Sequence, residues 1–343
     1  MKRMFSLLLS AALAVVVCAG GVFAAQVPDA LSGYCTQEEW EMLRLTNQER
    51  LAQDLSPYST FAVLQGAADI REKELVASYS HTRPDGTQCF TVLTQMGLGY
   101  TAAAENIASG QTSPADVISS WMNSEGHRGN ILDTHLSHMG TGYIADGMLD
   151  TSWVQLFMNK GCSVSSISLS QSAATCSAGT SLDDLDLYVE AVCPFHGSCY
   201  LPLLSGMCAG YDSGSLGVQT VTVTYGGRTA QLEVTVTAAP LDTSSADSWA
   251  VNWLNQANEM GLLSDRNRSQ FTANITRLQF ADLAVGLAET LTGSSITPAP
   301  TSTFPDTTDV SVLKAKAAGI AGGYGDGSFQ PNNPITRQEI CVM

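Results

Sequence analysis

The sequence predicts an α+β protein of several domains, because helix and strand patterns occupy different stretches of the chain. Its 343 residues suffice for two to four domains, and a hydrophobic content of 44% is ample for packed cores. Residues 34–160 mix helix and strand patterns, residues 165–238 show only strand patterns, and helical patterns return over residues 247–343.

Two helices are predicted at the start of the first region. Thr36 and Glu39 have the spacing of a capping box, which predicts a helix over residues 36–54. Apolar residues recur on one face of a second helix over residues 60–77, and Pro57 separates the two helices.

A third helix is predicted to open at Ser113, because a serine cap is followed by proline at the first helical position. Residues 140–144 and 151–158 have strand patterns on either side of a turn. The first region is therefore predicted to be a mixed helix–sheet domain of about 125 residues.

The second region, residues 165–238, is rich in Ser, Thr, Val and Gly. Two alternating runs within residues 217–236 are joined by Gly226-Gly227, which predicts a hairpin. Short strands separated by turn signals favour a small β-sandwich here.

The third region contains an internal repeat. Residues 275–280 and 335–340 are copies of one Ile-Thr-Arg pattern, and in each the Thr is followed three residues later by Gln or Glu. Each copy should therefore start a helix through a capping box. The repeat divides this region into residues 247–292, a degenerate copy, and residues 304–343.

The N-terminus has the order of a secretory signal peptide, with basic residues, an apolar run and small residues, so residues 1–24 are expected to be removed. The mature chain would carry 14 basic and 32 acidic residues, a net charge of 14 − 32 = −18. Such a charge argues against nucleic acid or anionic membrane as the main partner. The apolar run of the signal is shorter than the roughly 20 residues that a membrane span needs, and no other segment could span a bilayer.

Eight cysteines would remain after removal of the signal peptide, and disulfides are the default after export. Sequence alone cannot choose among 105 pairings of eight cysteines. Disulfides among Cys176, Cys193, Cys199 and Cys208 are favoured. The alternative is a zinc site, because Cys193, His196, Cys199 and Cys208 also have the spacing Cys-x2-His-x2-Cys-x8-Cys.

Three motifs carry the candidate chemistry: His81 to Gly86, Ala104 to Ala108, and Gly126 to Leu132. Each is expected to place a titratable side chain beside a tight turn or a helix end. The three side chains, His81, Glu105 and His127, have the composition of an open metal site or an acid–base pocket.

These motifs, with the run from Trp121 to Leu132, resemble the bacterial branch of the CAP superfamily of cysteine-rich secretory, antigen and pathogenesis-related proteins. The resemblance spans residues 34–160 and implies an α-β-α sandwich whose central cleft holds two histidines and acidic residues, and in some members a divalent metal. It places His81, Glu105 and His127 in the cleft. The second acid of the family is doubtful, since Asn123 and Ser124 stand at its place and Glu125 is adjacent.

Two further resemblances follow from the rest of the chain. Residues 165–238 resemble a bacterial immunoglobulin-like repeat, and residues 247–343 resemble surface-layer homology (SLH) repeats, with residues 323–331 the strongest stretch. SLH repeats bind anionic secondary cell-wall polymers. Arg277 and Arg337 match the arginine that contacts the polymer, and a guanidinium suits that task because it pairs bidentately with carboxylate.

Three functions therefore compete. The favoured one is a secreted, wall-attached CAP protein whose cleft binds zinc, another divalent cation or an unknown small ligand. The second is an extracellular metal-dependent hydrolase of peptide or wall material, although no Ser or Cys with a triad partner is apparent and a Cys35–Cys89 disulfide accounts for Cys89 more simply. The third is a structural spacer or adhesin with an inert fold.

Overall fold

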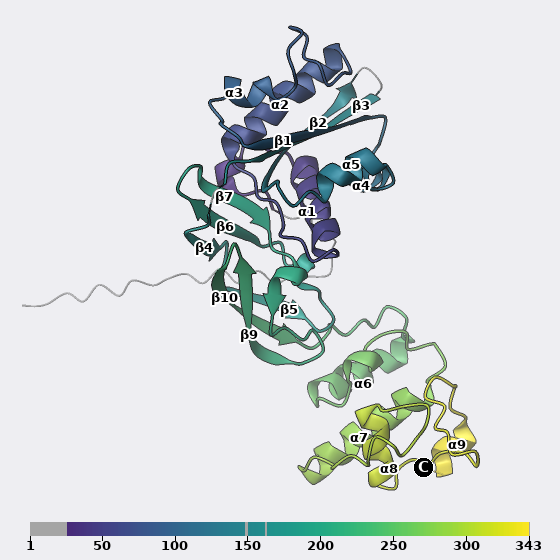
Figure 1. The fold of residues 1–343 in the computed structure, drawn as a ribbon. Coiled ribbons are helices and arrows are strands. Elements are labelled where there is room, and N and C mark those ends of the chain that lie inside the picture. Colours follow the sequence, from purple (N-terminus) through teal and green to yellow (C-terminus); the bar gives the residue numbers. More distant parts are fainter. Residues whose placement is uncertain (1–25, 148–149, 162, 343) are drawn as a thin grey trace, which may run out of the picture. The chain divides into compact units, whose positions relative to one another are not determined.

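The computed structural model describes residues 26–147, 150–161 and 163–342. The expected signal peptide, residues 1–24, lies outside these ranges. The contacts divide the chain after Val236 into two compact units, which are described separately (Figure 1). None of the described helices combines the length and the apolar character that a membrane span requires.

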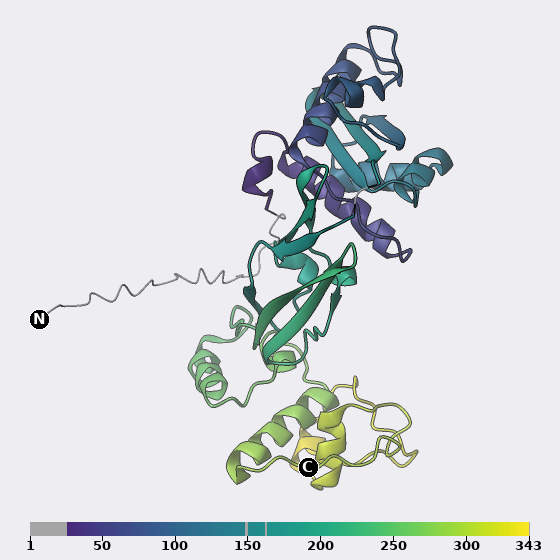
Figure 2. The ribbon, with the colours of Figure 1, turned by 60° about the vertical axis from the view of Figure 1, so that its left-hand side comes forward.

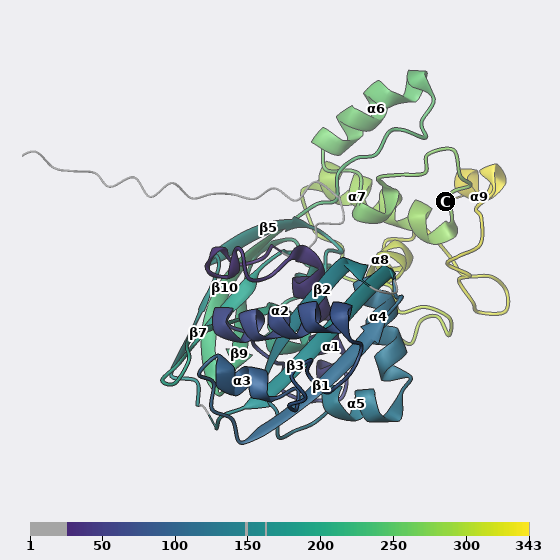
Figure 3. The ribbon, with the colours of Figure 1, turned by 90° about the horizontal axis from the view of Figure 1, so that it is seen from above.

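The first part of unit 1 consists of a three-stranded antiparallel sheet in the order β1-β3-β2, with helices on both sides (Figure 1). Its helices and strands are η1 (Asp29–Leu31), α1 (Gln37–Leu51), α2 (Ala62–Ala77), α3 (Thr91–Gln95), β1 (Ala102–Ser109), α4 (Pro114–Met122), α5 (Glu125–Ile131), β2 (His138–Gly147) and β3 (Asp150–Asn159). Figure 3 shows α2 lying across one face of this sheet.

Strand β3 explains why both faces of the sheet are covered. Successive side chains of a strand point to opposite faces. Trp153 and Phe157 pack into a core with α1 and α4, whereas Val154 and Leu156 pack into a second core with α2 and α3. A strand that is apolar on both faces needs a helical layer on each side, and this gives the α-β-α arrangement.

Local signals in the sequence set several element boundaries. The predicted capping box is confirmed, because the Thr36 side chain accepts the Glu39 amide N–H and Glu39 accepts the Thr36 amide N–H. The Ser113 cap is confirmed in the same way at the start of α4. Gly140 in β2 allows close approach of α2, since a Cβ there would lie 2.6 Å from the Leu64 carbonyl oxygen.

The second part of unit 1 holds two small antiparallel sheets, ordered β5-β10-β9-β8 and β4-β6-β7, which share one apolar core. Its elements are β4 (Ser166–Leu169), β5 (Ala173–Ser177), η2 (Leu182–Asp184), β6 (Tyr188–Cys193), β7 (Gly197–Pro202), η3 (Ser205–Met207), β8 (Cys208–Ala209), β9 (Gly217–Tyr225) and β10 (Arg228–Thr237). The predicted hairpin is confirmed, and Gly226 and Gly227 both have positive φ, as a two-residue loop of this kind requires.

The β6–β7 hairpin contacts the first part of unit 1. Thr60 and Tyr200 exchange backbone hydrogen bonds of 2.8 and 2.7 Å. Beside them the His196 ring stacks on Phe61, with 4.5 Å between centroids, and meets the edge of the His138 ring at 5.1 Å. Burial first, and then the neighbouring His196, lower the pKa of His138 to about 4.

Acid is expected to weaken unit 1 through His138. Its pKa is about 4 in the folded protein and about 6.5 when unfolded, so the unfolded chain binds more protons between these values. The stability is complete above about pH 6.5 and falls by up to about 3 kcal/mol as the pH drops towards 4. Urea unfolding of the full chain between pH 4 and 7 measures this.

His138→Asn, which cannot titrate, should remove that part of the pH dependence, whereas the exposed His135→Asn should leave it unchanged. Glu39 and Glu72 act with the opposite sign, because burial raises the pKa of both carboxyls. The comparison between variants separates the contribution of His138 from that of the two carboxyls. If the free energy of unfolding depended on pH equally in the unaltered protein, His138→Asn and His135→Asn, the assignment to His138 would be contradicted.

Unit 2 is helical (Figure 2). Its elements are α6 (Ser248–Glu259), η4 (Asp265–Asn267), α7 (Arg277–Thr292), α8 (Val310–Ala317) and α9 (Arg337–Val342). Both predicted capping boxes are confirmed, at Thr276 with Gln279 and at Thr336 with Glu339. The Ile335 amide N–H donates to the Ile275 carbonyl oxygen at 3.0 Å, so the two sequence copies lie side by side.

The disulfide predictions require correction. Cys35 and Cys89 are free thiols rather than a pair. Cys35 lies near Glu39 and Gln65, whereas Cys89 lies near Glu105, so the two sulfur atoms have different surroundings. In the second part of unit 1, Cys193 is disulfide-bonded, but its partner is none of Cys176, Cys199 and Cys208, so the predicted pairing among these four cysteines is wrong.

Candidate functional site

Glu105 lies in the middle of β1 rather than beside a turn or helix end, as the motif had suggested. It belongs to the same strand face as Ile107, which packs with α2 and α3. Because β1 is an edge strand, its outward carbonyl groups are unpaired by the sheet. The Asn130 side chain donates to the Glu105 carbonyl and the Trp121 indole donates to the Ile107 carbonyl. These bonds hold α4 and α5 against the edge of β1.

The Glu105 carboxylate is held between a cation and an imidazole. Its side chain is 1% exposed, and Arg71 of α2 donates to it from Nε at 2.7 Å and from Nη2 at 3.2 Å. His81 Nδ1 lies 2.8 Å from Glu105 Oε1, while the His81 side chain is 57% exposed. If Nδ1 carries the proton, the carboxylate orients the ring and leaves Nε2 with a free lone pair.

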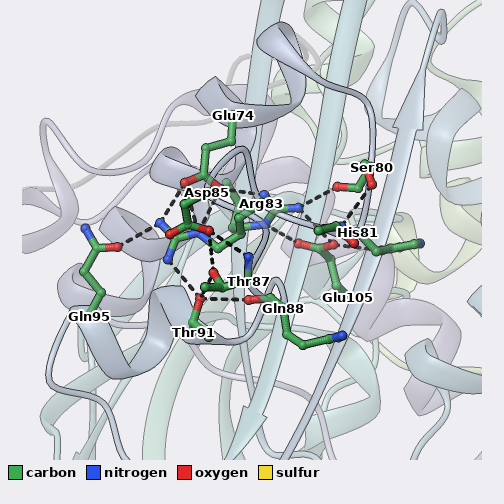
Figure 4. A network of polar contacts seen from close by, with 12 residues as sticks. Glu74, Ser80, His81, Arg83, Asp85, Thr87, Gln88, Thr91, Gln95 and Glu105 are labelled. Carbon is green, nitrogen blue, oxygen red and sulfur yellow. Dashed lines mark hydrogen bonds and ion pairs between the residues drawn. The ribbon is translucent and has the colours of Figure 1, made fainter.

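A polar network fixes the loop that carries His81 (Figure 4). Arg71 Nη2 donates to the Ser80 carbonyl, and Arg71 Nη1 pairs with Glu74 at 2.6 Å. Glu74 also pairs with Arg83 of the loop at 2.7 Å. The predicted turn is present at Gly86, whose φ is +84°. The loop is thereby tied to α2 at Ser80, just before His81, and at Arg83 within the motif.

His127 lies on α5, which is held at the outer edge of β1. The Asn106 side chain, fully buried on the opposite face of β1 from Glu105, donates to the His127 carbonyl at 3.1 Å and also bonds Asn130. Partial burial, and then the nearby His81, lower the pKa of His127, so both factors favour its neutral form. The neutral imidazole is the form that binds metals.

Cys89 is the donor that the sequence reasoning missed. Its sulfur, a His81 ring nitrogen and a Glu105 carboxylate oxygen all lie within 4.8 Å of one another. In the described ranges this is the one group of three or more His, Cys, Asp or Glu donors close enough to hold an ion. Burial, and then the Glu105 charge, raise the pKa of Cys89 to about 12.

The remaining predicted ligands lie elsewhere. Glu125 is exposed in the first turn of α5 and is not part of this group. The four residues with zinc spacing in the second part of unit 1, Cys193, His196, Cys199 and Cys208, do not form such a group either. Cys199 belongs to the same apolar core as Phe61, whereas Cys208 packs against the core that the two small sheets share.

The two predicted polymer-binding arginines of unit 2 have opposite surroundings. Arg277 is 3% exposed and lines a hollow of about 950 Å³ together with Tyr324 and Glu339. Its guanidinium donates to the Phe329 and Gly322 carbonyls and pairs with Glu339 at 3.1 Å. Arg337, at the same place in the second copy, is exposed.

Comparison with known proteins agrees with two of the three resemblances. Residues 43–157 match the cysteine-rich secretory protein (CAP) family, and residues 311–341 match the S-layer homology domain. The uncharacterized protein YkwD of Bacillus subtilis (strain 168) is 36% identical over 135 residues, which are 39% of this chain and 50% of that protein. The chain thus matches half the length of this relative.

Solved structures resemble parts of the chain as well. An extracellular protein containing an SCP domain from Bacillus anthracis str. Ames is 25% identical, with a TM-score of 0.34, over 39% of this chain and 44% of that one. A cysteine-rich secretory protein from Staphylococcus aureus subsp. aureus Mu50 is 23% identical, with a TM-score of 0.32, over 36% and 38%.

The chain therefore contains a CAP domain over residues 43–157 and an S-layer homology domain over residues 311–341. The immunoglobulin-like resemblance of residues 165–238 and the degenerate repeat at residues 247–292 stay predictions.

Proposed function

We propose that this is a cell-surface CAP protein. Its S-layer homology domain attaches it outside the cell to an anionic wall polymer, and its CAP domain binds a divalent cation at His81 and Glu105, beside His127. The cation acts in ligand binding at the surface. The Cys89 thiol lies beside His81, but its pKa is raised to about 12, which does not favour the thiolate that a covalent hydrolytic mechanism needs. Attachment is supported by the matched domain and by the exposed Arg337, whose guanidinium suits carboxylate.

The observation that carries the cation site is the pairing of an exposed imidazole with a buried carboxylate, His81 with Glu105. His81 Nδ1 and Glu105 Oε1 lie 2.8 Å apart, so both atoms can coordinate one cation when the ring proton is on Nε2. His127 offers a second imidazole in its neutral form nearby. The donor set fits a cation of the zinc class, which accepts imidazole and carboxylate ligands.

Titration of the full chain with Zn²⁺ in a calorimeter tests the site. His81→Ala is expected to weaken binding by about tenfold to a hundredfold, because the ring supplies a ligand directly. The matched control is His135→Ala, since His135 is also an exposed histidine paired with a carboxylate, that of Asp133 at 2.9 Å. Equal affinities of the two variants would exclude the proposed site.

A turnover assay tests the alternative that the site is hydrolytic. If a library of peptides and wall fragments were turned over and His81→Ala abolished that turnover, the cation would serve catalysis instead of ligand binding. Turnover by neither protein would leave the binding role as proposed.

A further inference from the structure

The loop after α2 is a small hairpin whose two ends are His81 and Cys89. Thr82 and Gln88 pair as an antiparallel bridge, and the Cys89 amide N–H donates to the His81 carbonyl at 3.1 Å. The turn between them is closed by Arg83, whose amide N–H donates to the Thr87 carbonyl at 2.9 Å. The backbone therefore holds the imidazole and the thiol opposite each other, above the Glu105 carboxylate.

We infer that Cys89 is a ligand of the cation, so that the site is a nitrogen–sulfur–oxygen centre made of His81, Cys89 and Glu105. This rests on the cation binding proposed above and adds to it the sulfur ligand and the class of ion. When the ion binds, the Cys89 thiol loses its proton to solvent and a metal–sulfur bond forms, with no change of oxidation state.

The distances suit such a centre after a small movement. Zinc bonds of about 2.0–2.3 Å in a tetrahedron place ligand atoms roughly 3.3–3.8 Å apart. The donor atoms here lie within 4.8 Å of one another, and His81 Nδ1 lies 2.8 Å from Glu105 Oε1. Glu105 and Cys89 are fixed by burial, so the exposed His81 ring is the part that adjusts.

The net charge of the residues around the site is compatible with a bound divalent cation. Arg71 and Arg83 share one network with Glu74, Glu105 and Asp85, so its formal charge is +2 − 3 = −1 (Figure 4). A divalent cation with one thiolate adds +2 − 1 = +1, which brings the site to a formal charge of zero. The three protein ligands leave a fourth position for water or a small ligand.

The donor types select the ion. A thiolate with an imidazole suits zinc and other late first-row cations, whereas Ca²⁺ and Mg²⁺ take oxygen ligands. A bound metal would also give a role to the Cys89 thiol, which is buried although most of the hairpin around it is exposed. None of the other described cysteines lies in such a group of donors.

Cobalt(II) absorption of the full chain tests the sulfur ligand, in a Cys341→Ser background because Cys341 is exposed. We expect a near-ultraviolet sulfur-to-cobalt charge-transfer band, and X-ray absorption of the zinc-loaded protein should show one sulfur at about 2.3 Å. Cys89→Ser should abolish the band and weaken binding by about tenfold or more. Cys35→Ser, at a free thiol elsewhere in the same domain, should retain both.

Two results would overturn the inference, and they are distinguishable. Co²⁺ or Zn²⁺ binding that depends on His81 but shows no sulfur scatterer would exclude Cys89 and leave the cation site standing. The absence of any binding would remove the cation site itself. The X-ray measurement uses the protein with Cys89 intact, so it shows whether sulfur binds the ion even if Cys89→Ser does not fold.

Discussion

Arg71→Ala is expected to destabilise unit 1 by about 3–5 kcal/mol, because the change leaves the buried Glu105 carboxylate without its cation. Both side chains are essentially inaccessible, at 0% and 1% exposure, and two donor atoms of the guanidinium contact the carboxylate. The same guanidinium also holds the Ser80 carbonyl, so the His81 loop should loosen with the loss of stability. Urea unfolding at pH 7 measures the first effect.

Arg44→Ala is the matched control. Arg44 also lies on a helix and pairs with a carboxylate three residues away, Glu41, but both side chains are 20–25% exposed. A surface pair of this kind contributes about 0–1 kcal/mol, so little stability should be lost. Losses of equal size in the two variants would mean that the Glu105 carboxylate is not dependent on Arg71.

The double variant Arg71→Met/Glu105→Leu separates lost pairing from lost packing. Replacing both partners by apolar side chains leaves no buried charge, so it should be less destabilising than Arg71→Ala. If the double variant is the less stable protein, packing rather than charge carries the effect.

Local signals in the sequence were sufficient for the boundaries of many elements. Thr36, Thr276 and Thr336 start helices because a cap depends on residues three positions apart. The Gly226-Gly227 hairpin follows in the same way from two adjacent residues with positive φ. Such features are encoded within a few residues, so no tertiary information is needed to predict them.

The candidate site could be predicted only in part. His81 and Glu105 were found from their motifs, but Arg71 shows no pattern that distinguishes it from a surface arginine of α2. Its burial depends on where α2 crosses the sheet, which is a tertiary property. Cys89 was missed because export makes a disulfide the default expectation for a cysteine, whereas the fold keeps Cys35 away from it.

The two arginines of the repeat illustrate the same limit. Identical motifs placed Arg277 and Arg337 in the same role, and only the packing of unit 2 separates them. Arg277 is enclosed because the loop over residues 322–329 folds across it, with the Tyr324 and Phe329 rings 4.4 and 4.8 Å from the guanidinium carbon. Arg337 starts α9 and remains exposed.

Arg277→Ala is accordingly expected to destabilise unit 2 by about 1–3 kcal/mol. The change leaves the buried Phe329 carbonyl without its donor, whereas the carbonyl of the exposed Gly322 can bond water instead. It also removes the partner of Glu339, whose pKa is lowered to about 2 by the Thr336 amide, and next by Tyr324, so that the carboxylate is charged at neutral pH. Urea unfolding of the full chain, followed by circular dichroism, should show an earlier transition for unit 2.

Arg337→Ala separates folding from attachment. As an exposed residue it should change the stability by no more than about 0.5 kcal/mol. If the polymer is bound through Arg337, this variant should pellet less with purified cell walls while its unfolding curve stays that of the unaltered protein. The Arg277→Ala variant should pellet less with cell walls because unit 2 is destabilised. Pelleting that survives both changes would reject an arginine-mediated attachment, because no guanidinium of the repeated motif would then remain to pair with the polymer's acidic groups.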